Sequence, residues 1–161
     1  MFLSSSGNDS AGCTASAPCR SLQRGFQAAA AGAVVSVAGG GYPEQSLTEA
    51  HRQVTFRASG SVTFAGLDLT CTTGITFEGI GAIQLGILAG NDNLTVRGGS
   101  FGGGSYSSGV ERDPVVIGDV GSCSRGDTSN GVTLDGIEVG PYLYPGQDAG
   151  SAHPDCLQIY G

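Results

Sequence analysis

A short pattern of alternating apolar and polar residues returns along the whole chain. In most copies the first and third residues are apolar, the second is small and polar, and a turn residue follows soon after. The seven copies start at Val35, Val54, Ile75, Leu94, Val115, Val132 and Leu157, and successive starts lie 17 to 25 residues apart. Alternation with a period of two predicts β-strands, and a strand that returns about every 20 residues predicts a solenoid of stacked coil turns.

The same alternation predicts which side chains of each copy are buried. The first and third residues are expected to share an inner face: Val35/Val37, Val54/Phe56, Ile75/Phe77, Leu94/Val96, Val115/Ile117, Val132/Leu134 and Leu157/Ile159. The second residues are expected to form an outer column that is rich in threonine: Ser36, Thr55, Thr76, Thr95, Val116, Thr133 and Gln158. Beside this column, Arg57, Glu78 and Arg97 are expected to form an exposed ladder of alternating charge.

Each repeat is long enough for three short strands and three bends, which favours a triangular coil over a two-sided one. The second strand is expected at Val62/Phe64, Ile83/Leu85 and Ile137/Val139, and Leu67/Leu69 is expected to begin a third. This pattern resembles the right-handed parallel β-helix proteins, of which the pectate-lyase-like superfamily is the best known. The resemblance implies an all-β fold, a single-stranded right-handed parallel β-helix of about seven rungs over residues 34–161.

Residues 1–33 are expected to cap the start of this coil. They contain a short apolar strand, a loop between Cys13 and Cys19, and a short capping helix that Ser21 begins and Gly32 ends. The helix is amphipathic, with one apolar face: Leu22, Phe26, Ala29 and Ala30. The order of these elements is similar to the N-terminal cap of secreted bacterial β-helix proteins. At the other end the last residue falls within a repeat, so further rungs or a partner chain are expected to cover the core there.

Composition narrows the classes of partner. The chain has 161 residues, 29 of them glycine, and its net charge is −7 with no lysine. An acidic chain without a basic patch argues against nucleic acid or an anionic membrane surface as the partner. The sequence also contains no run of apolar residues long enough to span a membrane.

Five cysteines in a chain of this composition suggest an oxidising compartment, so an extracellular or cell-surface location is expected although no export signal is recognisable. Cys13 and Cys19 enclose a short polar loop and are expected to form a local disulfide. Cys123 and Cys156 are expected to meet in the later rungs, which leaves Cys71 unpaired. The alternative is that these three cysteines are buried as small hydrophobic side chains.

Three long segments, residues 98–114, 119–131 and 140–155, leave the regular coil in its later part and are expected to project from one side. The last one contains His153 and Asp155. A carboxylate two residues from a histidine can fix the tautomer of the ring and raise its proton affinity, as a general acid or base requires. The segment is similar to the His-x-Asp-x-ϕ-Gln segments found in mid-coil in pectate-lyase-like proteins. The alternative is that both residues only close a loop.

Other residues of these segments are candidates for holding a sugar. Arg125 is a candidate catalytic residue, because its planar guanidinium can bind a sugar carboxylate through two hydrogen bonds. Tyr142 and Tyr144 are candidates for stacking on a sugar ring, and Asp148 and Gln158 for binding the substrate through hydrogen bonds. The alternatives are a solvated arginine and tyrosines that pack within their own loop.

Asp119 and Asp127 are the candidate ligands for a metal ion. Ca²⁺ takes oxygen ligands, and several loop carboxylates on neighbouring rungs can supply them. No EF-hand loop or glycine-rich calcium repeat is present, so the alternative is that these aspartates only stabilise the loops.

The expected function is therefore that of an extracellular protein that binds or acts on a polysaccharide, as a lyase or glycosidase whose site is incomplete in this chain. The paired-aspartate, Gly-His-Gly and Arg-x-Lys motifs of the hydrolases with this fold are absent. The alternative is a non-catalytic adhesion or spacer solenoid. Ice binding is disfavoured, because a charged column adjoins the threonine column and Val116 interrupts it.

Overall fold

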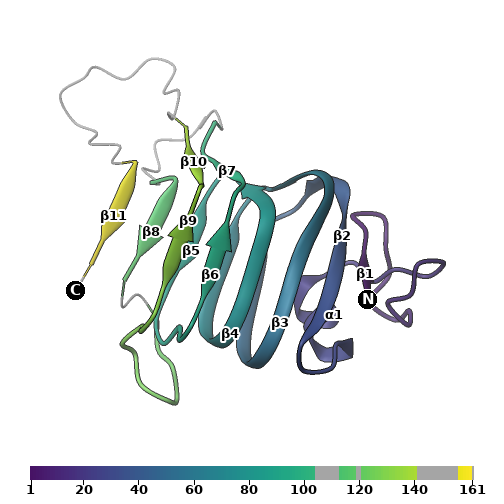
Figure 1. Cartoon of the computed structure of the whole chain (residues 1–161), viewed down its shortest axis with the longest axis horizontal. Helices are drawn as coiled ribbons and strands as arrows, with labels where there is room; N and C mark the ends of the chain where they lie inside the picture. Colours follow the sequence, from purple (N-terminus) through teal and green to yellow (C-terminus); the bar gives the residue numbers. More distant parts are fainter. Residues whose placement is uncertain (104–112, 119–120, 141–155, 161) are drawn as a thin grey trace.

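The protein folds mainly as parallel β-strands. The computed structural model describes residues 1–103, 113–118, 121–140 and 156–160 (Figure 1). Its elements are β1 (Phe2–Leu3), α1 (Leu22–Ala28), β2 (Ala33–Tyr42), β3 (Gln45–Phe64), β4 (Leu67–Ala82), β5 (Leu85–Ile87), β6 (Thr95–Arg97), β7 (Ser100–Phe101), β8 (Val115–Ile117), β9 (Thr133–Asp135), β10 (Glu138–Val139) and β11 (Leu157–Ile159). In the described part of the chain no helix is long and apolar enough to cross a membrane.

The strand pairs fall into three stacks, because β2, β3 and β4 bend and contribute to more than one. Stack A contains residues 33–38 of β2, 54–57 of β3, 75–78 of β4, then β6 and β9. Stack B contains residues 40–42, 62–64 and 80–82, then β7 and β10. Stack C contains residues 45–51 and 67–73, then β5, β8 and β11. The chain passes from stack C to A to B and back to C, as the layered ribbon of Figure 1 shows.

The register confirms the central part of the predicted repeat. Thr55 pairs with Thr76 and Thr76 with Thr95, while Arg57, Glu78 and Arg97 occupy the neighbouring column. The first copy is shifted by two residues, so that Val35 lies opposite Phe56 instead of opposite Val54. An even shift keeps the same side chains inside, because alternate residues of a strand face the same way.

Two of the seven copies belong to a different stack from the one predicted. Val115–Ile117 and Leu157–Ile159 pair within stack C, and Thr133 pairs directly with Thr95. Val116 therefore does not interrupt the threonine column, and the repeats are not seven successive rungs: apart from β1, which pairs with β2, each stack contains five described strands. The prediction failed here because every half-buried strand has the same period of two, whichever stack it joins.

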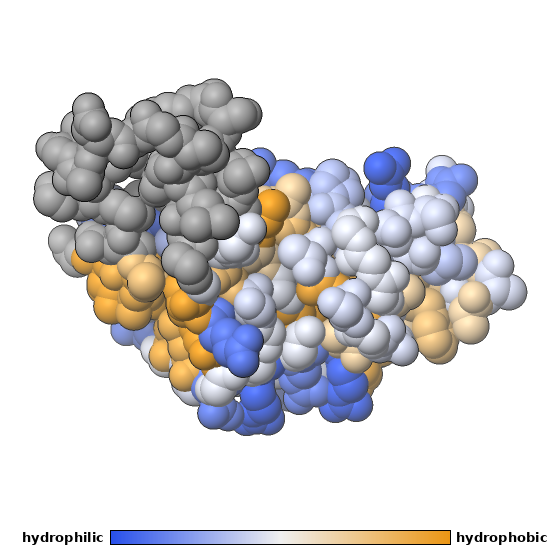
Figure 2. All heavy atoms as spheres, turned by 90° about the horizontal axis from the view of Figure 1, so that it is seen from above, coloured by the Kyte–Doolittle hydropathy of each residue, from blue (hydrophilic) through white to orange (hydrophobic). Residues whose placement is uncertain are grey.

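The core lies between the three stacks. Phe56 stacks on Phe77 with ring centroids 5.2 Å apart, and Tyr42 stacks on Phe64 at 4.7 Å. The predicted inner residues of the first four copies are all buried: Val35, Val37, Val54, Phe56, Ile75, Phe77, Leu94 and Val96. The predicted inner residues of the last copy are not, since Leu157 is 44% and Ile159 67% exposed. Figure 2 shows hydrophobic side chains gathered at this end of the molecule.

A cap covers the N-terminal end of the stacks. β1 pairs with β2, and the Ser21 side chain accepts a hydrogen bond from Arg24 N, as its predicted role as N-cap requires. The helix ends at Ala28, well before Gly32, because Ala29 is already extended. Arg52 lies 4.2 Å from the centroid of the Phe26 ring and donates to the Phe26 carbonyl, which gives that helix end a cationic partner.

Asp9 ties the N-terminal loop to the start of α1. Its Oδ1 accepts hydrogen bonds from Arg20 N at 2.7 Å and from Ser21 N at 2.9 Å. Burial raises the pKa of the Asp9 carboxyl, but these hydrogen bonds outweigh that effect and hold its pKa below the usual value of 3.8. The predicted disulfide between Cys13 and Cys19 closes the same loop.

The second disulfide corrects the predicted pairing. Cys123 is bonded to Cys71, and Cys156 is a free, exposed thiol. The bond passes over Gly90, where a Cβ would lie 2.4 Å from the Cys123 Cβ. Glycine at this position makes room for the bond. The Cys71–Cys123 disulfide joins residues 52 positions apart and ties the segment before β9 to β4.

Candidate functional site

The structure places only part of the predicted catalytic and binding set. Six of these residues lie outside the described residues: Asp119, Tyr142, Tyr144, Asp148, His153 and Asp155. Arg125, Asp127 and Gln158 are described. That Arg125, Asp127, Asp148, His153 and Asp155 meet in one groove stays a prediction.

Asp127 closes its own loop. Its Oδ1 accepts a hydrogen bond from Cys123 N at 2.7 Å, and its backbone carbonyl accepts one from Gly90 N at 2.7 Å. Arg125 is exposed in the same loop, and Gln158 lies at a half-buried position of β11, paired with Val116. The Asp127 side chain thus holds its own loop, and its backbone carbonyl ties that loop to the bend at Gly90; metal binding by Asp127 stays a prediction.

A shallow groove follows the edge where stack A turns into stack B. Its volume is about 350 Å³ and its lining comes from four successive passes of the chain: Ser61, Val62, Thr63, Gly79, Gly81, Gly99, Ser100, Gly136 and Glu138. The bends at Gly79 and Gly136 have φ of 67° and 60°, a left-handed conformation that glycine adopts without strain. Gly81 is also sterically required, since a Cβ there would lie 2.5 Å from the Ser100 carbonyl oxygen. Small residues keep this edge open.

A ladder of alternating charge runs beside this groove on the outer face of stack A. Arg57 Nε lies 2.6 Å from a carboxylate oxygen of Glu78. Arg97 lies 3.8 Å from Glu78 and 3.0 Å from Asp135. The ladder predicted from the sequence is therefore confirmed and gains a fourth member. The charges of the ladder are paired with one another. Among the residues that line the groove, Glu138 is the charged one.

A second groove follows the opposite edge of stack A. It has a volume of about 330 Å³ and is lined by Gly32, Gln53, Val54, Thr55, Gly74, Thr76 and Asn93. Polar grooves thus run across the strands at both edges of stack A, and Thr55 and Thr76 of the threonine column line the second one. Each groove is lined by residues from four successive passes of the chain, so an extended ligand that follows a groove would contact each pass in turn.

A buried polar network supports the bends between stacks C and A. Asn91 is fully buried; its Oδ1 accepts from Thr72 Oγ1 at 2.7 Å, and its Nδ2 donates to the carbonyls of Leu69 and Leu88 at 2.9 and 2.7 Å. Ser129 accepts from Asn91 N at 3.0 Å. Both the oxygen and the nitrogen of the Asn91 side-chain amide have hydrogen-bond partners, so burying this polar group costs little free energy. The same hydrogen bonds fix the bends between stacks C and A in position.

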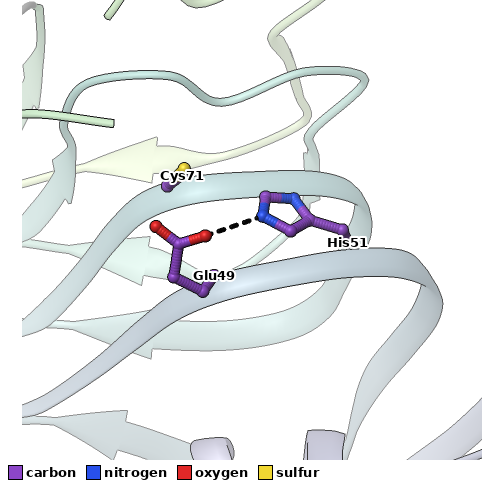
Figure 3. Close-up of side chains that lie close together, drawn as sticks. All are labelled: Glu49, His51 and Cys71. Carbon is purple, nitrogen blue, oxygen red and sulfur yellow. Dashed lines mark hydrogen bonds and ion pairs between the residues drawn. The ribbon is translucent and has the colours of Figure 1, made fainter. Parts of the chain in front are cut away.

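A cluster of potential metal ligands lies near the same bends and was not identified from the sequence. One ligand atom each of Glu49, His51 and Cys71 lies within 4.8 Å of the others (Figure 3). His51 Nε2 is 3.0 Å from Glu49 Oε2, and Nδ1 is 3.4 Å from Thr73 Oγ1. Glu49 and His51 are two residues apart, a spacing that places side chains on one face of a strand, but Cys71 joins them only through strand pairing.

Comparison of the chain with family models, with curated proteins and with solved structures finds no match. The functional argument therefore rests on the stacks, the two grooves and the side-chain clusters described above.

Proposed function

We propose that this protein is a right-handed parallel β-helix that binds a polysaccharide along its coil. The order of stacks C, A and B repeats on every pass, as in a triangular coil. Parallel strands joined in sequence are almost always connected by right-handed crossovers, which supports this hand of the coil. The two disulfides favour an oxidising compartment such as the cell exterior, where polysaccharides are abundant.

The observation that carries the binding proposal is the groove between stacks A and B. Four passes of the chain line it, and adjacent strands lie about 4.8 Å apart, so the groove presents an extended surface across the strands. Ser61, Thr63 and Ser100 offer hydroxyl groups, which both donate and accept hydrogen bonds as sugar hydroxyls do. Glu138 and the net charge of −7 disfavour an acidic polysaccharide here, so the proposed ligand is a neutral one.

Affinity electrophoresis through gels that contain neutral or acidic polysaccharides tests this function. The wild-type protein is expected to be retarded by a neutral polysaccharide, and Ser61→Trp, which fills the groove, is expected to weaken binding about tenfold or more, or ~1.4 kcal/mol. Ser59→Trp is the matched control, because Ser59 is exposed two residues away and does not line the groove.

Equal binding by both variants would refute the groove as the binding site. Retardation only by an acidic polysaccharide would favour the segment that contains Arg125. Release of reducing or unsaturated sugars would show that the protein is an enzyme, and no retardation by any polysaccharide would favour the spacer solenoid.

A further inference from the structure

We propose that reduction of the Cys71–Cys123 disulfide creates a zinc site made of both cysteines, His51 and Glu49. This proposal does not depend on polysaccharide binding. It concerns the corner between stacks C and A, on the other edge of stack A from the sugar groove.

The backbone places Glu49 and Cys71 side by side. Thr48 pairs with Thr70 and Ala50 with Thr72, so Glu49 and Cys71 occupy the same position on neighbouring strands. Both residues have left-handed backbones, with φ of 49° and 55°. This conformation is uncommon for residues other than glycine, and Glu49 and Cys71 share it at equivalent positions of the two strands.

Gly90 provides the space for the second sulfur. Thr73 pairs with Asp92, which puts Gly90, in the turn after β5, at the position of Cys71 on the next pass of the chain. A Cβ at Gly90 would lie 2.5 Å from Cys123 Sγ, so the sulfur occupies the volume that a side chain would have filled. The Cys123 backbone is held there by Asp127, and this hydrogen bond does not involve the disulfide. Opening the disulfide therefore leaves Cys71 Sγ within 4.8 Å of a ligand atom each of Glu49 and His51, and it leaves Cys123 Sγ beside Cys71.

The four side chains are those that Zn²⁺ prefers. Zinc binds thiolate sulfur, imidazole nitrogen and carboxylate oxygen, and structural sites have four ligands. Thr73 Oγ1 lies 3.4 Å from His51 Nδ1 and can orient the ring while Nε2 faces Glu49. In the oxidised protein the two sulfur atoms are bonded to each other and supply no thiolate, so they do not bind a zinc ion.

The reaction balances with a phosphine as the reductant. The disulfide gains two electrons and two protons and becomes two thiols, while the phosphine takes up the oxygen of a water molecule and becomes a phosphine oxide. Zn²⁺ then displaces the two thiol protons into the buffer. The segment before β9 would thus be held to β4 by a disulfide under oxidising conditions and by a metal ion under reducing ones.

Titration calorimetry with Zn²⁺, with and without tris(2-carboxyethyl)phosphine, tests the proposal. The reduced wild-type protein is expected to bind one Zn²⁺ at this site with release of about two protons per ion, and the oxidised protein none. With Co²⁺ in place of Zn²⁺, sulfur-to-cobalt charge-transfer absorption is expected only after reduction.

Variants separate this site from the other thiols. Cys71→Ser and His51→Ala are expected to weaken zinc binding at least about tenfold, the scale of effect seen even when only supporting groups of a metal site are lost. Cys156→Ser, which removes the exposed free thiol, is expected to bind as the wild type does. Glu49→Gln keeps the size of the side chain and removes the charge, so it is expected to weaken binding without unfolding the protein.

Either of two results would overturn the proposal. One is a reduced wild-type protein that binds no zinc although its circular dichroism spectrum is unchanged. The other is zinc binding by the Cys71→Ser and His51→Ala variants with the affinity of the wild type, because the ion would then be held by Cys13, Cys19 or Cys156.

Discussion

Removal of the Cys71–Cys123 disulfide should be the more costly of the two possible disulfide losses. A disulfide stabilises a protein mainly by restricting its unfolded chain, and the effect grows with the logarithm of the loop that it closes. The bond between Cys71 and Cys123 spans 52 residues and the bond between Cys13 and Cys19 spans 6. The same relation gives about 4 kcal/mol for the longer loop and about 2 kcal/mol for the shorter one.

Urea unfolding of the oxidised protein measures both values. The double variant Cys71→Ser/Cys123→Ser should lose about 4 kcal/mol of unfolding free energy, and Cys13→Ser/Cys19→Ser about half as much. Cys156→Ser is the control and should leave the free energy unchanged, because Cys156 is exposed and free. A large loss in Cys156→Ser together with none in Cys71→Ser would refute the pairing and restore the one expected from the sequence.

Three further predictions concern the coil and its cap. Phe77→Ala should lower the free energy of unfolding in urea by about 3–5 kcal/mol, because Phe77 is buried in the phenylalanine stack, and Thr76→Ala on the outer face should lower it by under half of that. Equal losses would refute the register. Glu78→Gln should cost about 0.2–1 kcal/mol per exposed ion pair, and the cost should fall with added salt; a cost that salt does not change would contradict solvent screening. Asp9→Asn should destabilise the protein at pH 7 and much less at pH 3, because a lowered carboxyl pKa contributes stability that is lost as the pH falls through it; a cost independent of pH would exclude the hydrogen-bonded carboxylate.

The regular part of the fold could be predicted because sequence pattern and strand pairing agree there. Between Val54 and Arg97 each copy ends in a bend that contains glycine, and the inner positions are large and apolar. After Arg97 the connections lengthen, and alternation alone no longer tells which stack a strand joins. This is why Val115–Ile117 was predicted to lie on stack A, although it pairs with β5 on stack C.

The side-chain clusters could not be predicted, because they arise from pairing between strands. Cys71 and Cys123 are 52 residues apart, and their bond depends on the bare backbone of Gly90 in a turn beside them. His51 had no recognisable motif, since its partners come from its own strand at Glu49 and from the next strand at Thr73. The residues that were proposed from local motifs lie mostly in segments 119–120 and 141–155, outside the described residues.

Positions at the corners between stacks can vary more in residue type than positions along the strands. Along each strand alternate positions are committed to the core, and on stack A the outer positions are filled by threonines and by the charge ladder. At a corner, equivalent positions on successive passes hold different residues: Glu49, then Cys71, then Gly90 between stacks C and A. Because adjacent strands are about 4.8 Å apart, three such positions are enough to bring a carboxylate, a sulfur atom and an open space together. A fold of stacked parallel strands can therefore build a metal or ligand site by changing one residue per pass of the chain, without disturbing the core that holds the strands in register.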